Sequence, residues 1–119
     1  MENFGLAFQI ISLTSIIFFF SACNASSTKP SPADFDKLCN IYKNVSAEYK
    51  KTNDLLLSQG NLYLNIKAEI PNMLDDYQNV ITEAPEGRYK LYQQIAEIRI
   101  KQKWDCPAAE SYYLAIANN

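Results

Sequence analysis

An uncharged apolar run at the amino terminus limits how much of this chain can fold as a globule. Residues 4–20 contain no acidic or basic side chain and consist mainly of phenylalanine, isoleucine and other apolar residues. A run of this kind so close to the first residue is typical of the h-region of an export signal. Removal of residues 1–22 leaves 97 of the 119 residues, which is enough for one small domain with its own core.

The apolar run leads directly into Ser21, Ala22 and Cys23. Small residues followed by a cysteine at this position resemble the lipobox of bacterial lipoproteins, and the match covers residues 20–23. The resemblance implies a lipoprotein signal peptide at residues 1–22. It also implies that Cys23 is lipidated and that the membrane is a partner of the chain through this anchor.

Two alternatives to the lipid anchor stay open. Residues 4–20 are at the lower edge of the length that spans a bilayer, so they can also be an uncleaved transmembrane anchor, and an ordinary cleaved signal is the other alternative. In each case the globular part is exported. Asn24 after the lipid-bearing cysteine resembles the outer-membrane sorting pattern of Gram-negative lipoproteins, which implies a periplasm-facing outer-membrane location. An inner-membrane anchor is the alternative.

Composition excludes several classes of function. The net charge is −2, and no stretch concentrates lysine and arginine, so the electrostatic attraction that dominates nucleic-acid binding is missing. The chain has no histidine, which excludes imidazole metal sites and Ser-His or Cys-His nucleophile pairs. Beyond the signal only Gly60 and Gly87 remain, too few for a phosphate-binding loop. We therefore expect no enzyme, metal site, cofactor or nucleic-acid partner.

The rest of the chain divides into a linker and a helical domain. Residues 23–33 hold the lipidated cysteine and a stretch of small polar residues with two prolines, which is typical of a flexible linker. Residues 34–119 show helical periodicity, and Ser31-Pro32-Ala33-Asp34 predicts a capped helix start. The predicted helices cover residues 32–50, 53–70, 72–84, a segment from the turn at 85–87 to about 102, and 107–116.

Several boundaries are open. Residues 62–70 and 98–104 also alternate as a half-buried strand would, and helix is favoured for 62–70 because of the length of the segment. Asn53 is the predicted N-cap of the second helix, and Asp105 or Cys106 that of the last helix. We expect an all-α fold, a small disulfide-stapled helical bundle of four to five helices.

Cys39 and Cys106 are the two cysteines left in the domain, 67 residues apart and outside any Cys-x-x-Cys pair. In an exported protein such a pair predicts a disulfide. A bridge that closes a loop of this length stabilises the fold by about 4 kcal/mol on the chain-entropy estimate. A redox-active pair is the alternative.

Three motifs carry a second resemblance: Leu38-Cys39 near the start of the domain, Pro85-x-x-Arg88-Tyr89-x-Leu91, and Trp104-x-Cys106-Pro107-Ala108 near the end. Together they resemble an uncharacterised family of small helical domains in secreted and lipid-anchored bacterial proteins, over residues 35–112. The resemblance implies a bundle with a disulfide between its first and last helices, and it implies no activity.

Charged side chains give little indication of chemistry. Asp75 and Asp76 are adjacent, so on a helix they point about 100° apart and cannot act as an opposed carboxylate pair. We interpret them as a solvated helix face. Arg88 follows the turn at 85–87 and is either an ordinary surface residue or an anion-binding group near a helix start.

Tyrosine is the distinctive residue of the domain. All eight tyrosines follow residue 23, whereas five of the six phenylalanines lie before it. Tyrosines that a small core cannot cover are favoured in interfaces. Tyr63, Tyr112 and Tyr113 are the predicted exposed interaction residues, because they lie off the main apolar stripes or near the chain end.

Two functions fit these features. The first is a lipid-anchored structural or protein-interaction module that docks on other envelope proteins, such as a secretion assembly. The alternative is a periplasmic lipoprotein that binds a small ligand or inhibits an exported enzyme. A cavity lined by tyrosine with a convergent polar group favours ligand binding, and a broad exposed patch of tyrosine and leucine favours the interaction module.

Overall fold

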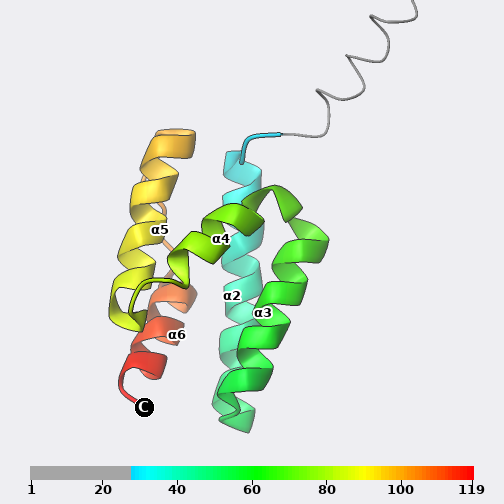
Figure 1. The fold of residues 1–119 in the computed structure, drawn as a ribbon, viewed down its shortest axis with the longest axis vertical. Helices are drawn as coiled ribbons and strands as arrows, with labels where there is room; N and C mark the ends of the chain where they lie inside the picture. Colours follow the sequence, from blue (N-terminus) through cyan, green and yellow to red (C-terminus); the bar gives the residue numbers. More distant parts are fainter. Residues whose placement is uncertain (1–27) are drawn as a thin grey trace, which may run out of the picture.

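The computed structural model describes residues 28–119, which form five α-helices, one short 3-10 helix and no strand (Figure 1). The helices are α2 (Pro32–Thr52), α3 (Leu55–Glu69), α4 (Leu74–Val80), α5 (Pro85–Ile100) and α6 (Pro107–Ala117), and η1 (Pro71–Met73) leads into α4. The predicted all-α fold is confirmed. Within residues 28–119, no helix has both the length and the apolar character needed to cross a membrane.

The predicted anchor cannot be followed in the structure. The signal peptide at residues 1–22 and the lipidation site Cys23 lie outside the described residues. The description begins at Thr28, within the predicted linker, and Pro30 is already buried. The folded part therefore includes the last residues of the segment that composition assigned to the linker.

The start of α2 follows the predicted capping pattern. The Ser31 hydroxyl accepts the Asp34 backbone N–H, and the Asp34 carboxylate accepts the Ser31 backbone N–H at 2.9 Å. The side-chain amide of Asn72 donates to the same carboxylate at 3.0 Å. One acidic residue thus caps α2 and also holds the segment that precedes α4 against it.

The corner between α2 and α3 differs by one residue from the prediction. Asn53 does not cap α3; it ends α2 in the left-handed conformation at φ 53°, a conformation that asparagine tolerates better than most residues. Asp54 is the N-cap of α3, and its carboxylate accepts the Leu57 backbone N–H at 3.0 Å. Both residue types suit either role, so the sequence pattern alone did not separate them.

Neither segment with strand-like alternation forms a strand: residues 62–69 are helical, and of 98–104 residues 98–100 end α5 while 101–104 are irregular. α3 runs through Glu69 with Ser58, Leu62 and Ile66 buried at spacings of four, and Pro71 follows its end. α5 continues to Ile100 and stops at Lys101, which adopts the left-handed conformation at φ 56°. Burial of one side of each helix therefore follows the helical repeat and not the two-residue alternation of a strand.

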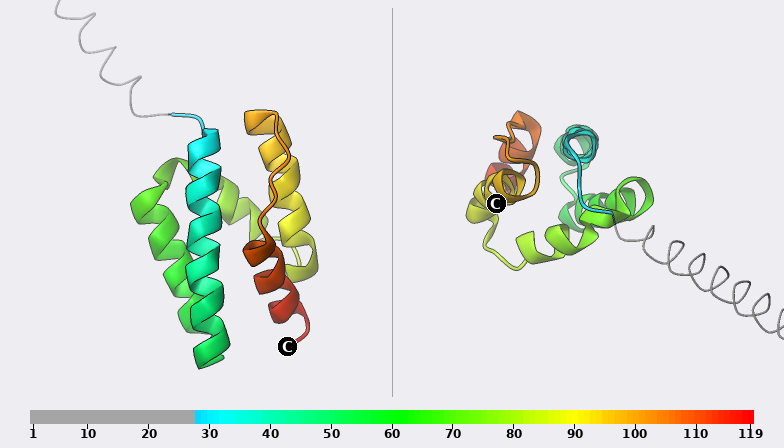
Figure 2. Two further views of the ribbon diagram at one scale, coloured as in Figure 1. Left: turned by 180° about the vertical axis from the view of Figure 1, so that it is seen from behind. Right: turned by 90° about the horizontal axis from the view of Figure 1, so that it is seen from above.

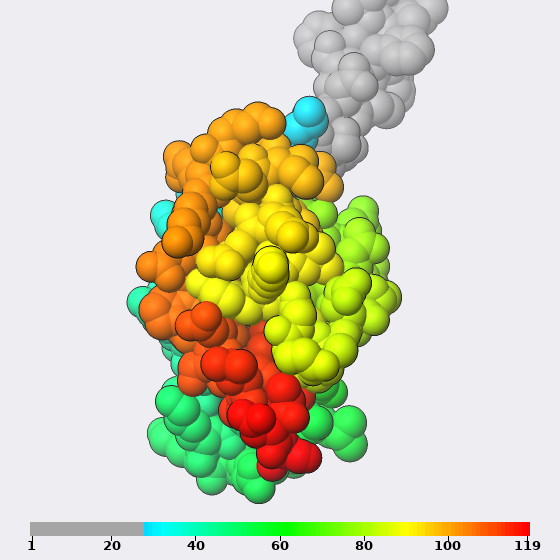
Figure 3. Space-filling view, turned by 90° about the vertical axis from the view of Figure 1, so that its left-hand side faces the viewer, coloured from blue at the N-terminus to red at the C-terminus, as the bar shows by residue number. Residues whose placement is uncertain are grey.

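The helices pack around α2. α2 contacts α3 on one side and α6 on another, α6 also contacts α5, and α4 crosses from α3 to α5 (Figure 1). Residues 101–106 return from the end of α5 to the start of α6 (Figure 2). In the space-filling view α5, α6 and this connection form one continuous face of the molecule (Figure 3).

A disulfide fixes the return connection to α2. Cys39 on α2 is bonded to Cys106, the N-cap residue of α6, with their Cα atoms 5.7 Å apart. The predicted disulfide is thus present. Next to it, the Trp104 indole N–H donates to the Phe35 backbone carbonyl at 3.1 Å, and the Phe35 and Trp104 rings meet edge to face. The bridge and the tryptophan together hold the chain between α5 and α6 on the first helix.

Candidate functional site

Tyrosines fill the centre of the bundle. The Tyr42 ring, fully buried on α2, lies between 5.5 and 5.9 Å from the rings of Tyr92, Tyr112 and Tyr113, measured between centroids. The Tyr42 hydroxyl donates to the Tyr92 hydroxyl at 3.2 Å and also bonds the Tyr113 hydroxyl. Because a hydroxyl has one hydrogen, Tyr113 is the donor in the second bond.

Two of the three predicted exposed tyrosines are buried instead. Tyr112 and Tyr113 are only 1% and 2% exposed, and Tyr63 is half-buried on α3. The prediction of an exposed patch was wrong for the α6 pair because α6 packs against both α2 and α5. Tyr112 and Tyr113 point about 100° apart on α6, so packing against two helices covers both side chains.

Burial holds these phenols in their neutral form. Loss of solvent raises the pKa of Tyr42, Tyr92 and Tyr113 well above the ordinary value of 10, and charge repulsion from neighbouring tyrosines raises it further, whereas the hydrogen bond with Tyr42 lowers it at Tyr92 and Tyr113. Burial also raises the pKa of Tyr77 to about 12. At neutral pH the cluster is therefore an uncharged network of hydroxyl groups.

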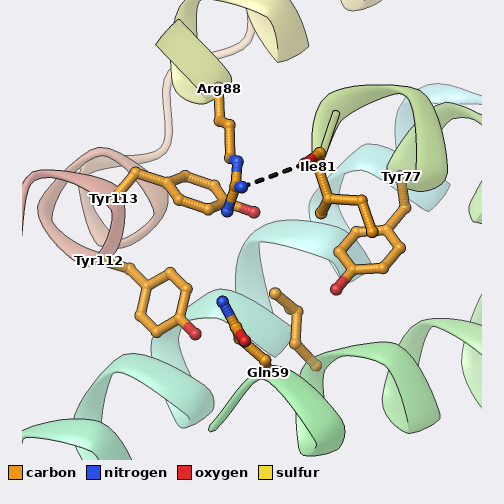
Figure 4. Close-up of a pocket in the computed structure, with 7 residues that line it drawn as sticks. Gln59, Tyr77, Ile81, Arg88, Tyr112 and Tyr113 are labelled. Carbon is orange, nitrogen blue, oxygen red and sulfur yellow. Dashed lines mark hydrogen bonds between the residues drawn. The ribbon is translucent and has the colours of Figure 1, made fainter. Parts of the chain in front are cut away.

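A pocket of about 260 Å³ opens beside this cluster (Figure 4). It lies where α3, α4, the α4–α5 connection, α5 and α6 meet, and residues from each of them form its wall. The lining residues are Gln59, Leu62, Tyr77, Ile81, Arg88, Tyr112 and Tyr113. The two tyrosines of α6 thus contribute to a concave site rather than to an exposed patch.

Arg88 is held in place over one side of the pocket. Its Nε–H donates to the Glu83 carbonyl at 2.9 Å and its Nη2 group to the Ile81 carbonyl at 3.1 Å. The guanidinium carbon lies 5.5 Å from the centroid of the Tyr113 ring, a cation–π distance. Three of its five N–H donors have no acceptor within residues 28–119, and no carboxylate there pairs with it.

Other polar side-chain groups line the same pocket. The Tyr77 hydroxyl and the Gln59 side-chain amide line the pocket, and neither makes a hydrogen bond to another group of residues 28–119. The Tyr112 hydroxyl also lines it and bonds the Ser58 hydroxyl at 2.8 Å. Leu62 and Ile81 supply apolar wall. The site therefore combines one fixed cation and two free polar groups with apolar and aromatic surface.

The adjacent aspartates behave differently from each other. Asp75 is exposed as expected, whereas Asp76 is 4% exposed, so the interpretation of both as a solvated face was wrong. The Arg99 guanidinium donates to both Asp76 oxygens, at 3.0 and 3.3 Å. These bonds raise the pKa of Arg99. The pair joins α4 to α5 away from the pocket.

The pocket wall offers hydrogen-bond donors, aromatic rings and apolar side chains. Residues 28–119 contain no group of three or more Cys, Asp or Glu side chains placed to hold a metal ion. The Cys39 and Cys106 thiols are tied in the disulfide. Donors, aromatic rings and apolar wall can recognise a molecule without a covalent step.

Sequence reasoning found only part of this site. Arg88 was noted as a potential anion-binding residue, and Tyr112 and Tyr113 as interaction residues. Gln59 and Tyr77 were missed because no local motif marks either residue. Their meeting depends on how α3 and α4 pack, for which the sequence offers no local signal.

Comparison with known proteins adds no relative to this picture. Neither family models, nor curated proteins, nor solved structures give a match to the chain.

Proposed function

We propose that this chain is an exported domain that binds a small anionic molecule with an apolar or aromatic body. The observation that carries the proposal is the Arg88 guanidinium. It is fixed by two backbone carbonyls and the Tyr113 ring, yet lacks a carboxylate partner within residues 28–119. A preorganised cation on the wall of a pocket provides charge-assisted hydrogen bonds to an anion at little ordering cost.

The lining residues define the ligand further. The Tyr77 hydroxyl and the Gln59 amide line the same pocket as Arg88. Both are hydrogen-bond donors, so they can donate to a carboxylate bound in the pocket beside Arg88. Leu62, Ile81 and the Tyr113 ring then face the body of the ligand. The volume of about 260 Å³ is below the roughly 300 Å³ at which drug-sized pockets begin. The pocket therefore suits a small ligand with one anionic group.

The cellular setting is part of the proposal. Export with a lipid on Cys23 places the domain on the periplasmic side of the outer membrane, with an inner-membrane anchor as the alternative. The disulfide between Cys39 and Cys106 suits an oxidising compartment. In this setting the domain is a non-enzymatic, membrane-tethered binding protein.

A protein-interaction module is the second candidate. The observation that favours it is the exposed apolar surface of α3, where Leu56 is 81% and Leu64 60% exposed. This surface contains none of the predicted exposed tyrosines apart from half-buried Tyr63 nearby. A protein contact through α3 is compatible with ligand binding in the pocket.

A titration with matched probes tests the proposal. Phenylacetate carries a carboxylate on an aromatic body, and phenylacetamide is its neutral counterpart. Backbone amide NMR signals of Gln59, Arg88 and Tyr113 in the purified full chain are expected to shift with phenylacetate and much less with phenylacetamide. Equal shifts with both probes, or none with either, would remove the anion site.

A further inference from the structure

We propose that the outer face of α3 is a contact between two copies of this chain, which pair antiparallel about a two-fold axis at Gly60. The face is unpartnered in the fold, with Leu56 81% and Leu64 60% exposed. Between Asp54 and Lys67, α3 carries no charged side chain. An exposed apolar helix face of this kind indicates a contact surface.

Gly60 is in the middle of this face. A Cβ atom added there would meet nothing within 4 Å, and the residue has no positive φ. Nothing inside the folded chain therefore requires glycine, although glycine is less favourable than alanine within a helix. A second helix that crosses closely at this point does require it, because the missing side chain lets two backbones approach.

The arrangement of leucines favours a second copy over an unrelated partner. Leu56 and Leu64 are each four residues from Gly60, in opposite directions. In an antiparallel pair centred on Gly60, Leu56 of one copy faces Leu64 of the other, and the same contact repeats on the far side of the axis. A surface that matches itself under rotation is what a two-fold dimer needs.

The charges at the two ends of α3 match in the same way. Asp54 lies six residues before Gly60 and Lys67 seven residues after it, so antiparallel pairing brings Asp54 of one copy within about one residue rise, roughly 1.5 Å along the axis, of Lys67 of the other. Both residues are exposed. Asp54 lies at the flank of the face, about 120° round the helix from Gly60, and one of its carboxylate oxygens caps α3. A parallel pair would instead place the two Asp54 residues near each other, and likewise the two Lys67 residues.

One helix face is small for an interface. Stable interfaces bury at least about 1,200 Å² in total, whereas the large exposed apolar side chains of α3 are three, Leu56, Leu57 and Leu64. The dimer is therefore weak and concentration-dependent. Leu56, Gly60 and Leu64 are not among the residues that line the Arg88 pocket, so the dimer stands independently of the ligand proposal.

Sedimentation velocity of the full chain tests the dimer. The wild type is expected to shift toward dimer as its concentration rises to about 1 mM, and Leu64→Glu to remain monomeric. Ile98→Glu is the matched control, because Ile98 on α5 is 68% exposed and lies outside the face. Gly60→Leu is expected to raise the melting temperature while abolishing the dimer, which separates loss of contact from loss of folding.

Zero-length carbodiimide cross-linking tests the geometry. In one copy Asp54 and Lys67 are thirteen residues apart along α3, about 20 Å, too far for a direct amide bond. A mixture of 14N- and 15N-labelled chains is expected to yield an isotopically mixed Asp54–Lys67 peptide. A wild type that stays monomeric at about 1 mM, or a dimer that persists in both Leu64→Glu and Gly60→Leu, would overturn the proposal.

Discussion

The Asp76 carboxylate on α4 accepts two hydrogen bonds from Arg99, near the end of α5, across 23 residues of sequence. The Asp76 side chain is 6% exposed, whereas that of Arg99 is 41% exposed. The arginine therefore reaches in from solvent to satisfy a carboxylate that packing has removed from water. α4 has only seven residues, too few to be stable alone, so this pair helps to fix it.

Arg99→Met is expected to destabilise the fold by about 2 kcal/mol, because the buried carboxylate of Asp76 loses both of its donors. Lys101→Met, which removes an exposed charge just after α5, is the control and should change the free energy of unfolding by less than about 0.5 kcal/mol. Urea denaturation of both variants measures the difference. Equal effects would mean that the pair contributes nothing specific.

Tyr42→Phe is expected to cost about 1–3 kcal/mol of unfolding free energy. The change keeps the ring but leaves the buried hydroxyls of Tyr92 and Tyr113 without the oxygen that joins them. Tyr63→Phe provides the control, since the Tyr63 hydroxyl has no hydrogen bond within residues 28–119 and its ring is half-buried. Thermal and urea unfolding of the two variants should differ clearly if the hydroxyl network stabilises the bundle.

Stability is expected to fall as the pH rises above about 10. Tyr42, Tyr77, Tyr92, Tyr112 and Tyr113 all have pKa values raised by burial in the folded chain. Each releases its proton more readily when unfolded, so its contribution is complete below pH 10 and is lost as the pH rises toward the folded pKa. The loss per tyrosine is about 1.4 kcal/mol per pH unit.

The absorbance of the ionised tyrosine side chain, the phenolate, measures this loss of protons directly. We expect these tyrosines to ionise together with unfolding, in one cooperative step, rather than one by one in the folded state. A gradual titration near pH 10 with helical circular dichroism unchanged would contradict the buried cluster.

Reduction of the disulfide is expected to lower stability by about 4 kcal/mol, because Cys39 and Cys106 close a long loop in the unfolded chain. For a domain of this size that corresponds to a fall in melting temperature of roughly 15 °C or more. A Cys39→Ala, Cys106→Ala double variant should behave like the reduced protein. An unchanged melting temperature would mean that Trp104 and its neighbours hold the return connection without the bridge.

Local signals predicted the parts of the fold that depend on neighbours in sequence. The capping box of Ser31 and Asp34 lies within one helical turn, and the buried positions Leu38, Tyr42, Val45 and Tyr49 repeat at helical spacing. The disulfide was predicted from the number of cysteines in the domain and from its expected export. These features involve few residues and little tertiary context, so the sequence patterns were sufficient.

The remaining features depend on packing between distant segments. The burial of Tyr112 and Tyr113 depends on α6 contacting α2 and α5 at once, and that of Asp76 on a partner 23 residues away. The pocket brings Gln59 and Arg88 together from separate helices. None of these contacts can be predicted from the spacing of residues within one helix.

The most direct test of the anion pocket is a change in charge at Gln59. Gln59→Glu places a carboxylate on the pocket wall, while Gln94→Glu makes the same change at an exposed position of α5 outside it. We would measure phenylacetate affinity by NMR titration of the full chain and both variants. At least a tenfold loss is predicted for Gln59→Glu, equivalent to about 1.4 kcal/mol, with Gln94→Glu unchanged. Equal affinities for the wild type and Gln59→Glu would contradict the pocket as the binding site.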